Sequence, residues 1–128
     1  MVHLVLLTGS LRKASCNTGL LRSCAAAITA LGHTAELIVP SALPLFSQDL
    51  EADEENPLMA NVRDFRKRIQ EADAVVLGCP EYNYSVSCVM KNALDWASRS
   101  PVRFVLLLSV LNVCGIALWL SLSRVRAC

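Results

Sequence analysis

The sequence has little glycine and proline, five of each in 128 residues, and only 5% of it is aromatic. The low glycine and proline content excludes a collagen-like chain, and an apolar content of 54% excludes an intrinsically disordered one. A chain of this length fits one domain with one core. We therefore expect a single core-forming domain.

The charge distribution excludes nucleic-acid binding. Residues 1–95 carry eight lysines and arginines and all eleven acidic residues, a net charge of −3, whereas residues 96–128 carry four arginines and no acid. A nucleic-acid-binding surface would need a basic stripe interleaved with aromatic residues. The asymmetry instead marks a basic tail or a joint between unlike sequences.

Several short motifs are also missing. The six cysteines include no CxxC pair and no cluster with histidine, so we predict reduced thiols in a cytoplasmic protein, with neither a disulfide framework nor a metal site. The patterns GxxxxGK[ST] and GxGxxG are absent, which excludes a P-loop and a dinucleotide-binding fingerprint. The chain starts without a basic segment, so we expect no secretory signal.

What is present is an alternation of apolar runs and helical periodicities. Apolar runs at residues 3–8, 34–39 and 74–79 predict strands. Helical spacing after each run predicts three helices, the first ending at Gly32 and the second having Pro57 in its first turn. The expected apolar faces of the second and third helices are Leu58, Val62, Phe65 and Ile69, and Cys88, Val89, Asn92, Ala93 and Trp96. This order predicts an α/β fold with a flavodoxin-like, doubly wound parallel sheet in three layers.

The last part of the chain breaks the alternation. Residues 104–122 are nineteen residues without a charge, and arginines flank them on both sides. By length they could form a short membrane span, but four serine, asparagine and glycine residues dilute their apolarity. Residues 102–110 could equally form a fourth buried strand, and the segment could also lack an evolved role. We favour a buried strand or helix over a membrane span.

Two polar loops follow the first and third predicted strands, where ligands bind in sheets of this kind. The first loop, residues 9–18, offers hydroxyl groups, an amide, an arginine and a helix N-terminus, which are the groups that hold a phosphate monoester. The second loop, residues 79–87, places two tyrosines and an asparagine where they could wall a planar heterocycle. Taken alone, either loop could be an ordinary capped turn.

Taken together, GSLRKAS (residues 9–15), PEYNYS (80–85) and KNALDW (91–96) resemble the NADPH-dependent FMN reductase family, especially its plant and bacterial quinone and chromate reductases. The resemblance implies an NAD(P)H dehydrogenase (quinone) that uses FMN, takes a hydride from NADPH or NADH at flavin N5, and passes two electrons to a quinone in a ping-pong cycle. Flavin carries the reactivity, so no catalytic side chain is expected.

The family also implies which residues bind FMN. In the first loop the phosphate would be held by Ser10, Arg12, Ser15, Cys16, Asn17 and Thr18. In the second loop the flavin ring would be lined by Pro80, Glu81, Tyr82, Asn83, Tyr84 and Ser85. Cys16 is expected to contribute its backbone rather than to act as a nucleophile.

The resemblance is expected to end at Arg99. The family's glycine-rich loop and its last strand and helix have no counterpart after this residue. We therefore divide the chain into an FMN-binding domain at residues 1–99 and a divergent segment at residues 100–128, the pattern of a truncated isoform or a frameshifted gene model. The alternative function is that of a catalytically impaired FMN-binding or subunit-pairing module. Relatives form dimers and tetramers, which implies a homodimer or homotetramer.

A sheet of only three strands would leave apolar surface uncovered. Exposed apolar area costs about 25 cal/mol per Å², and a few hundred Å² would consume much of a typical stability of about 5–15 kcal/mol. We therefore expect residues 102–110 to replace the fourth strand in part.

Overall fold

The computed structural model describes residues 1–99, 105–109 and 122–123. Its elements, in chain order, are β1 (His3–Thr8), α1 (Cys16–Ala30), β2 (Thr34–Ile38), α2 (Gln48–Ala52), α3 (Met59–Glu71), β3 (Ala74–Cys79), β4 (Glu81–Tyr82), β5 (Ser85–Val86), α4 (Cys88–Ala97), β6 (Val105–Ser109) and β7 (Leu122–Ser123). The three predicted strands and three predicted helices are confirmed. Helix α2 and the hairpin of β4 and β5 lie in segments predicted as loops.

The main sheet has the strand order β2-β1-β3-β6-β7. Strand β1 pairs in parallel with both β2 and β3, so the chain moves to one side of β1 first and then crosses to the other. The strand order therefore reverses between β1 and β3, as predicted. The doubly wound α/β fold is confirmed, and ligand binding is expected beyond the carboxyl ends of these two strands.

The fourth strand also forms where it was predicted. Strand β6 pairs in parallel with β3, from Val75 opposite Val105 to Cys79 opposite Ser109. The expectation that residues 102–110 supply this strand is thus confirmed for residues 105–109. The membrane span considered for residues 104–122 lies largely outside the described residues. In the part of the chain that the structure does describe, no helix is long and apolar enough to cross a bilayer.

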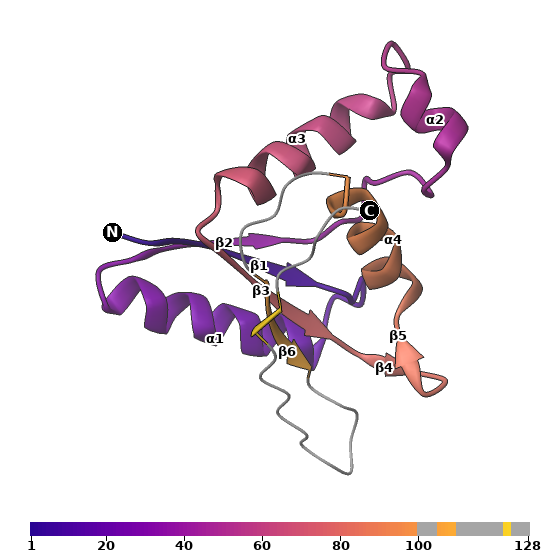
Figure 1. The fold of residues 1–128 in the computed structure, drawn as a ribbon. Coiled ribbons are helices and arrows are strands. Elements are labelled where there is room, and N and C mark those ends of the chain that lie inside the picture. Colours follow the sequence, from indigo (N-terminus) through magenta and orange to yellow (C-terminus); the bar gives the residue numbers. More distant parts are fainter. Residues whose placement is uncertain (100–104, 110–121, 124–128) are drawn as a thin grey trace.

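The sheet is covered on both faces, with α1 on one side and α3 and α4 on the other (Figure 1). On the α1 side, Leu21 packs on Leu6 and Val76. Leu21 lies so close to β3 that a Cβ atom on Gly78 would be 2.7 Å from its Cδ1 atom. On the other side, the alternate residues of β1 and β3 pack against α3 and α4. Burial on both faces explains why Leu4–Leu7 of β1 and the residues of β3 are apolar or small.

The apolar faces of two helices differ from the prediction. Leu58 is exposed, because it precedes the first turn of α3, and Met59 is buried in its place. In α4, Cys88 is exposed, because it is the first residue of the helix and lies at the edge of the sheet. The buried residues of α4 are Met90, Ala93, Trp96 and Ala97. The predicted stripes were therefore right in spacing but began one or two residues too early.

Candidate functional site

Helix α1 begins at Cys16, within the predicted first loop, so Asn17 and Thr18 lie in the helix and not in the loop. Ser15 is the N-cap residue, and its Oγ atom accepts a hydrogen bond of 3.2 Å from the backbone N–H of Thr18. The backbone N–H groups of Cys16 and Asn17 have no partner within the helix, as in the first turn of any α-helix. These groups and the helix dipole create a positive potential at the carboxyl edge of β1, which favours an anion there.

Hydroxyl groups hold the first loop against β1. Thr18 Oγ1 lies 2.9 Å from Thr8 Oγ1, and both side chains are buried. The N–H of Ser10 donates to Thr8 Oγ1 at 3.3 Å, and the N–H of Arg12 donates to Ser10 Oγ at 3.4 Å. The Thr18 hydroxyl thus fixes the helix start to the strand.

Two side chains of the first loop are ready to meet a ligand. Arg12 is exposed, and its guanidinium pairs with no acid among the described residues. Asn17 is buried, and its Oδ1 atom is the one buried side-chain oxygen or nitrogen in the described part of the chain that lacks a hydrogen-bond partner. Buried polar atoms normally have a partner, so the orphaned amide points to a polar ligand at this loop. These groups fit a phosphate ester that also carries hydroxyl groups.

The second loop is a hairpin rather than an irregular turn. Strands β4 and β5 pair antiparallel, and the two residues between them, Asn83 and Tyr84, have φ angles of 53° and 61°. Two consecutive positive φ values are typical of a type I′ turn. The Glu81 carboxylate accepts a hydrogen bond of 2.7 Å from the N–H of Tyr84. The Glu81 side chain therefore holds the turn, and its backbone is what remains to face a ligand.

Tyr84 combines a strained backbone with a fully exposed ring. The left-handed conformation is unfavourable for a tyrosine, and such strain persists mostly where function requires it. We expect Tyr84→Gly to raise Tm by roughly 3 °C in a thermal melt, because Asn-Gly is the preferred pair in this turn. Tyr84→Phe keeps the strain and should leave Tm unchanged. A fall in Tm on Tyr84→Gly would contradict a strained turn.

The two loops meet at Gly9. Its N–H donates to the carbonyl of Gly78 at 2.8 Å, and its carbonyl accepts from Ser87 Oγ at 2.6 Å. Ser87 was not among the predicted site residues. A serine directly before a helical pattern is an N-cap signal, which could have drawn attention to it.

The third motif, residues 91–96, anchors a connector rather than a ligand. Asn92 Nδ2 and Trp96 Nε1 both donate to the carbonyl of Pro44, at 2.9 and 2.8 Å, and Asn92 Oδ1 accepts from the N–H of Phe46 at 2.8 Å. The Phe46 and Trp96 rings meet edge to face, with 4.9 Å between their centroids. These contacts dock the segment between β2 and α2 onto α4.

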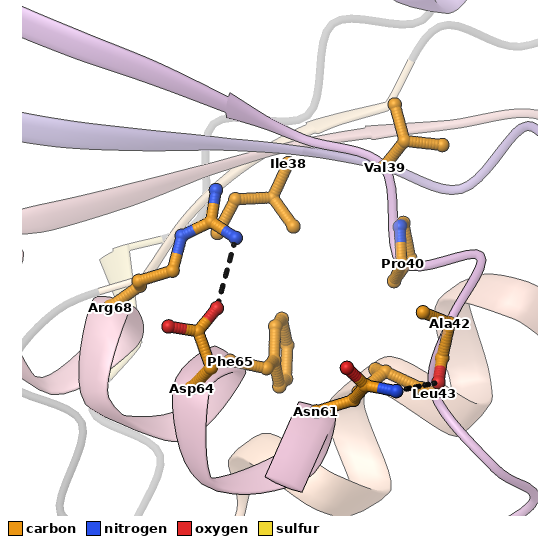
Figure 2. Close-up of a pocket in the computed structure, with 9 residues that line it drawn as sticks. All are labelled: Ile38, Val39, Pro40, Ala42, Leu43, Asn61, Asp64, Phe65 and Arg68. Atoms are coloured by element: carbon orange, nitrogen blue, oxygen red, sulfur yellow. Dashed lines mark hydrogen bonds and ion pairs between the residues drawn. The ribbon is translucent and has the colours of Figure 1, made fainter.

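Two of the cavities formed by described residues lie on the side of the sheet that carries α3 and α4. One, of about 140 Å³, is lined by Leu11, Pro40, Ser41, Leu43, Leu45, Cys88, Val89 and Asn92. The other, of about 160 Å³, lies between the end of β2 and α3 and is shown in Figure 2. The structure brings the twelve predicted site residues to the carboxyl edge of β1 and β3, but none of them lines either cavity.

The cavity in Figure 2 is not an anion site, although Arg68 lines it. The Arg68 guanidinium donates twice to Glu36, at 2.6 and 2.9 Å, and lies 3.4 Å from an Asp64 oxygen. The hydrogen bond to Glu36 is the main cause of a raised pKa for Arg68. With both carboxylates in contact, this arginine is already neutralised. The cavity in Figure 2 therefore offers no free positive charge, and the candidate site consists of the two loops.

The chain is similar in sequence to known proteins. The sequence model of the NADPH-dependent FMN reductase family matches residues 2–116, so the match continues beyond Arg99, where the resemblance was expected to end. NADPH:quinone oxidoreductase of Arabidopsis thaliana is 47% identical over 106 residues, which cover 79% of this chain and 52% of that protein. Quinone reductase of Escherichia coli strain K12 is 39% identical over 100 residues, covering 78% and 52%.

Solved structures show the same fold. The flavoenzyme NAD(P)H:(acceptor) oxidoreductase of Paracoccus denitrificans has a TM-score of 0.71 at 30% identity, covering 85% of this chain and 60% of that one. An FMN-dependent NADH-azoreductase of Bacillus anthracis, solved with FMN, has a TM-score of 0.66 at 11% identity, covering 87% and 69%, and shares the fold. The chain spans about half the length of the curated relatives it matches.

Proposed function

The chain belongs to the NADPH-dependent FMN reductase family, and on that premise we propose that it binds FMN and, with NADPH or NADH as donor, reduces quinones or similar small electron acceptors. One observation carries the proposal. At the point where the strand order reverses, the start of α1, the exposed Arg12 and the orphaned Asn17 amide lie at the same sheet edge as the hairpin of the second loop. Ligands of doubly wound proteins bind at this edge.

The first loop would hold the FMN phosphate. The N–H groups of Cys16 and Asn17 would donate to it, together with the hydroxyls of Ser10 and Ser15, and Arg12 would supply the opposite charge. The second loop would line the ring, with the backbone of Pro80–Asn83 along its polar rim and the tyrosines beside it. Ser85 would contribute from the far strand of the hairpin.

FMN held by these loops would supply the redox chemistry of a ping-pong cycle, in which the hydride of NADPH or NADH is accepted at N5 and then passed, with a proton from water, to the quinone. The chain's own groups bind and orient. The Glu81 carboxylate is occupied by the Tyr84 N–H and holds the hairpin. The Thr18 hydroxyl is occupied by Thr8 and holds the start of α1. The proposal therefore requires no side chain that exchanges protons, and we further propose a cytoplasmic homodimer or homotetramer.

A second candidate is an FMN-binding or subunit-pairing module without turnover of its own. It requires only the two loops of the proposed FMN site, and both loops lie among the described residues. The two candidates share the FMN site and differ in activity. They also differ in whether residues 100–128 act as part of the domain or as a divergent tail.

The test is an FMN titration followed by an assay of NADPH oxidation with a benzoquinone. We expect Arg12→Ala to weaken FMN binding roughly tenfold to a hundredfold, because a charged hydrogen bond to phosphate is lost. Arg22→Ala is the matched control, since Arg22 is an exposed arginine further along α1 and should leave binding unchanged. FMN binding without turnover would favour the second candidate. Failure of the wild-type chain to bind FMN would overturn both.

A further inference from the structure

One buried hydroxyl joins the two loops. Ser87, the last residue of the second loop, is 1% exposed. Its Oγ atom donates to the Gly9 carbonyl at 2.6 Å and accepts from the N–H of Met90 at 3.2 Å. It also lies 3.9 Å from Cys79 Sγ, at the end of β3. This atom therefore contacts the start of the first loop, the end of β3 and the start of α4.

The backbone of the first loop is tightly packed at this contact. Gly9 is tied to β3 through its N–H and to Ser87 through its carbonyl. A Cβ atom on Gly9 would lie 2.9 Å from Ser87 Oγ and 3.0 Å from Met90 Cβ, so the backbone of the loop rests directly on the start of α4. Without the Ser87 hydroxyl, Gly9 would keep only its bond to β3.

Helix capping does not account for this geometry. A serine caps a helix by accepting from a backbone N–H, which Ser87 does with Met90. Its single hydroxyl proton is left over for another acceptor, and that acceptor is the carbonyl of Gly9, 78 residues away in the sequence. Capping needs only the oxygen, whereas the donated bond links the loops.

We propose that Ser87 is a positioning residue that fixes the spacing between the two loops and thereby sets the affinity for a ligand that spans both. The inference rests on the proposed function, in which the FMN phosphate lies on the first loop and the flavin ring on the second. A ligand with two linked groups binds tightly only when the protein presets the distance between the two subsites. Riboflavin, which lacks the phosphate, does not depend on that distance.

The experiment compares the dissociation constants of FMN and riboflavin in the full chain and in Ser87→Ala. We expect FMN binding to weaken roughly tenfold, the effect of one lost buried hydrogen bond, and riboflavin binding to change by about twofold or less. Ser98→Ala is the matched control, because it removes a hydroxyl that donates to Asp95 at the other end of α4 and should alter neither constant. Ser87→Gly is a second variant that keeps a favourable N-cap residue if the alanine variant folds poorly.

The ratio of the two dissociation constants decides the outcome. If Ser87 has a purely structural role, its replacement will weaken the binding of FMN and of riboflavin by the same factor, and the ratio will stay unchanged. Either that result or unaltered binding of both ligands would overturn the inference. If the wild-type chain binds no FMN, the proposed function fails and the inference fails with it. If the wild-type chain binds FMN and the ratio does not move in either variant, only the role of Ser87 is refuted.

Discussion

Gly9→Ala is expected to lower the free energy of unfolding by about 1–3 kcal/mol and to weaken FMN binding at least roughly tenfold. The new methyl group would lie 2.9 Å from Ser87 Oγ, 3.0 Å from Met90 Cβ and 3.2 Å from Cys79 Sγ. The Cβ atom of Met90 is fixed by helix α4 and cannot rotate away. Relief must therefore come from a shift of the first loop, which breaks the bond to Ser87 and misplaces the N-terminus of α1.

Urea unfolding followed by circular dichroism measures the first effect, and an FMN titration measures the second. Gly19→Ala is the matched control, because Gly19 lies in α1 and a Cβ atom there meets nothing within 4 Å. In a helix this exchange should raise the free energy of unfolding by up to about 1 kcal/mol. If Gly9→Ala matched the control in both measurements, the close approach of the first loop to α4 would be disproved.

The sheet could be read from the sequence because its central strands are buried on both faces. Strands β1 and β3 lie between two layers of helices, so Leu4–Leu7 of β1 and the residues of β3 are apolar or small and contrast with the amphipathic helices. Strand β6 was predicted from an apolar run that also allowed a membrane span. Its pairing with β3 shows that residues 105–109 form a strand and not a helix or a membrane span. Local sequence could not decide this, because strand pairing depends on contacts between residues far apart in the chain.

The starts and ends of elements were harder to predict because they depend on single hydrogen bonds. Helix α1 begins at Cys16 because Ser15 caps it, which moves Cys16, Asn17 and Thr18 from the loop into the helix. The hairpin of the second loop depends on positive φ values at Asn83 and Tyr84, and a tyrosine gives no signal for them. Local sequence predicted the presence of a turn there but not its type.

The residue types of the site could be predicted, but not which side chains are free to bind a ligand and which hold the loops in place. The sequence grouped Thr18 and Glu81 with the ligand-binding residues, yet both side chains are occupied in holding the loops. It omitted Ser87, whose partner Gly9 is distant along the chain. Which hydroxyl meets a ligand and which meets the protein is set by tertiary packing. The predicted contacts with FMN therefore remain predictions that the titrations above can test.

Trp96→Ala is expected to have the largest effect on stability, a loss of about 3–5 kcal/mol. Trp96 is fully buried in the core on the α4 side of the sheet. Its Nε1–H donates to the Pro44 carbonyl at 2.8 Å, and its ring contacts Phe46. Removing the indole leaves a cavity and also releases the connector between β2 and α2. A single domain at the lower end of the usual range of about 5–15 kcal/mol would then be close to unfolding.

Trp96→Phe separates the contribution of the packed ring from that of the hydrogen bond to Pro44. The smaller ring retains most of the apolar contact but loses the hydrogen bond to Pro44, so we expect a loss of about 1–2 kcal/mol, measured by urea unfolding with circular dichroism as the probe. Asn92 still donates to the same carbonyl, so the connector should stay docked in Trp96→Phe and come loose in Trp96→Ala. Faster proteolysis near residues 41–47 in the alanine variant alone would report that release. If both variants lost the same stability, the hydrogen bond rather than the packed ring would hold the connector, and the motif at residues 91–96 would act mainly through its polar atoms.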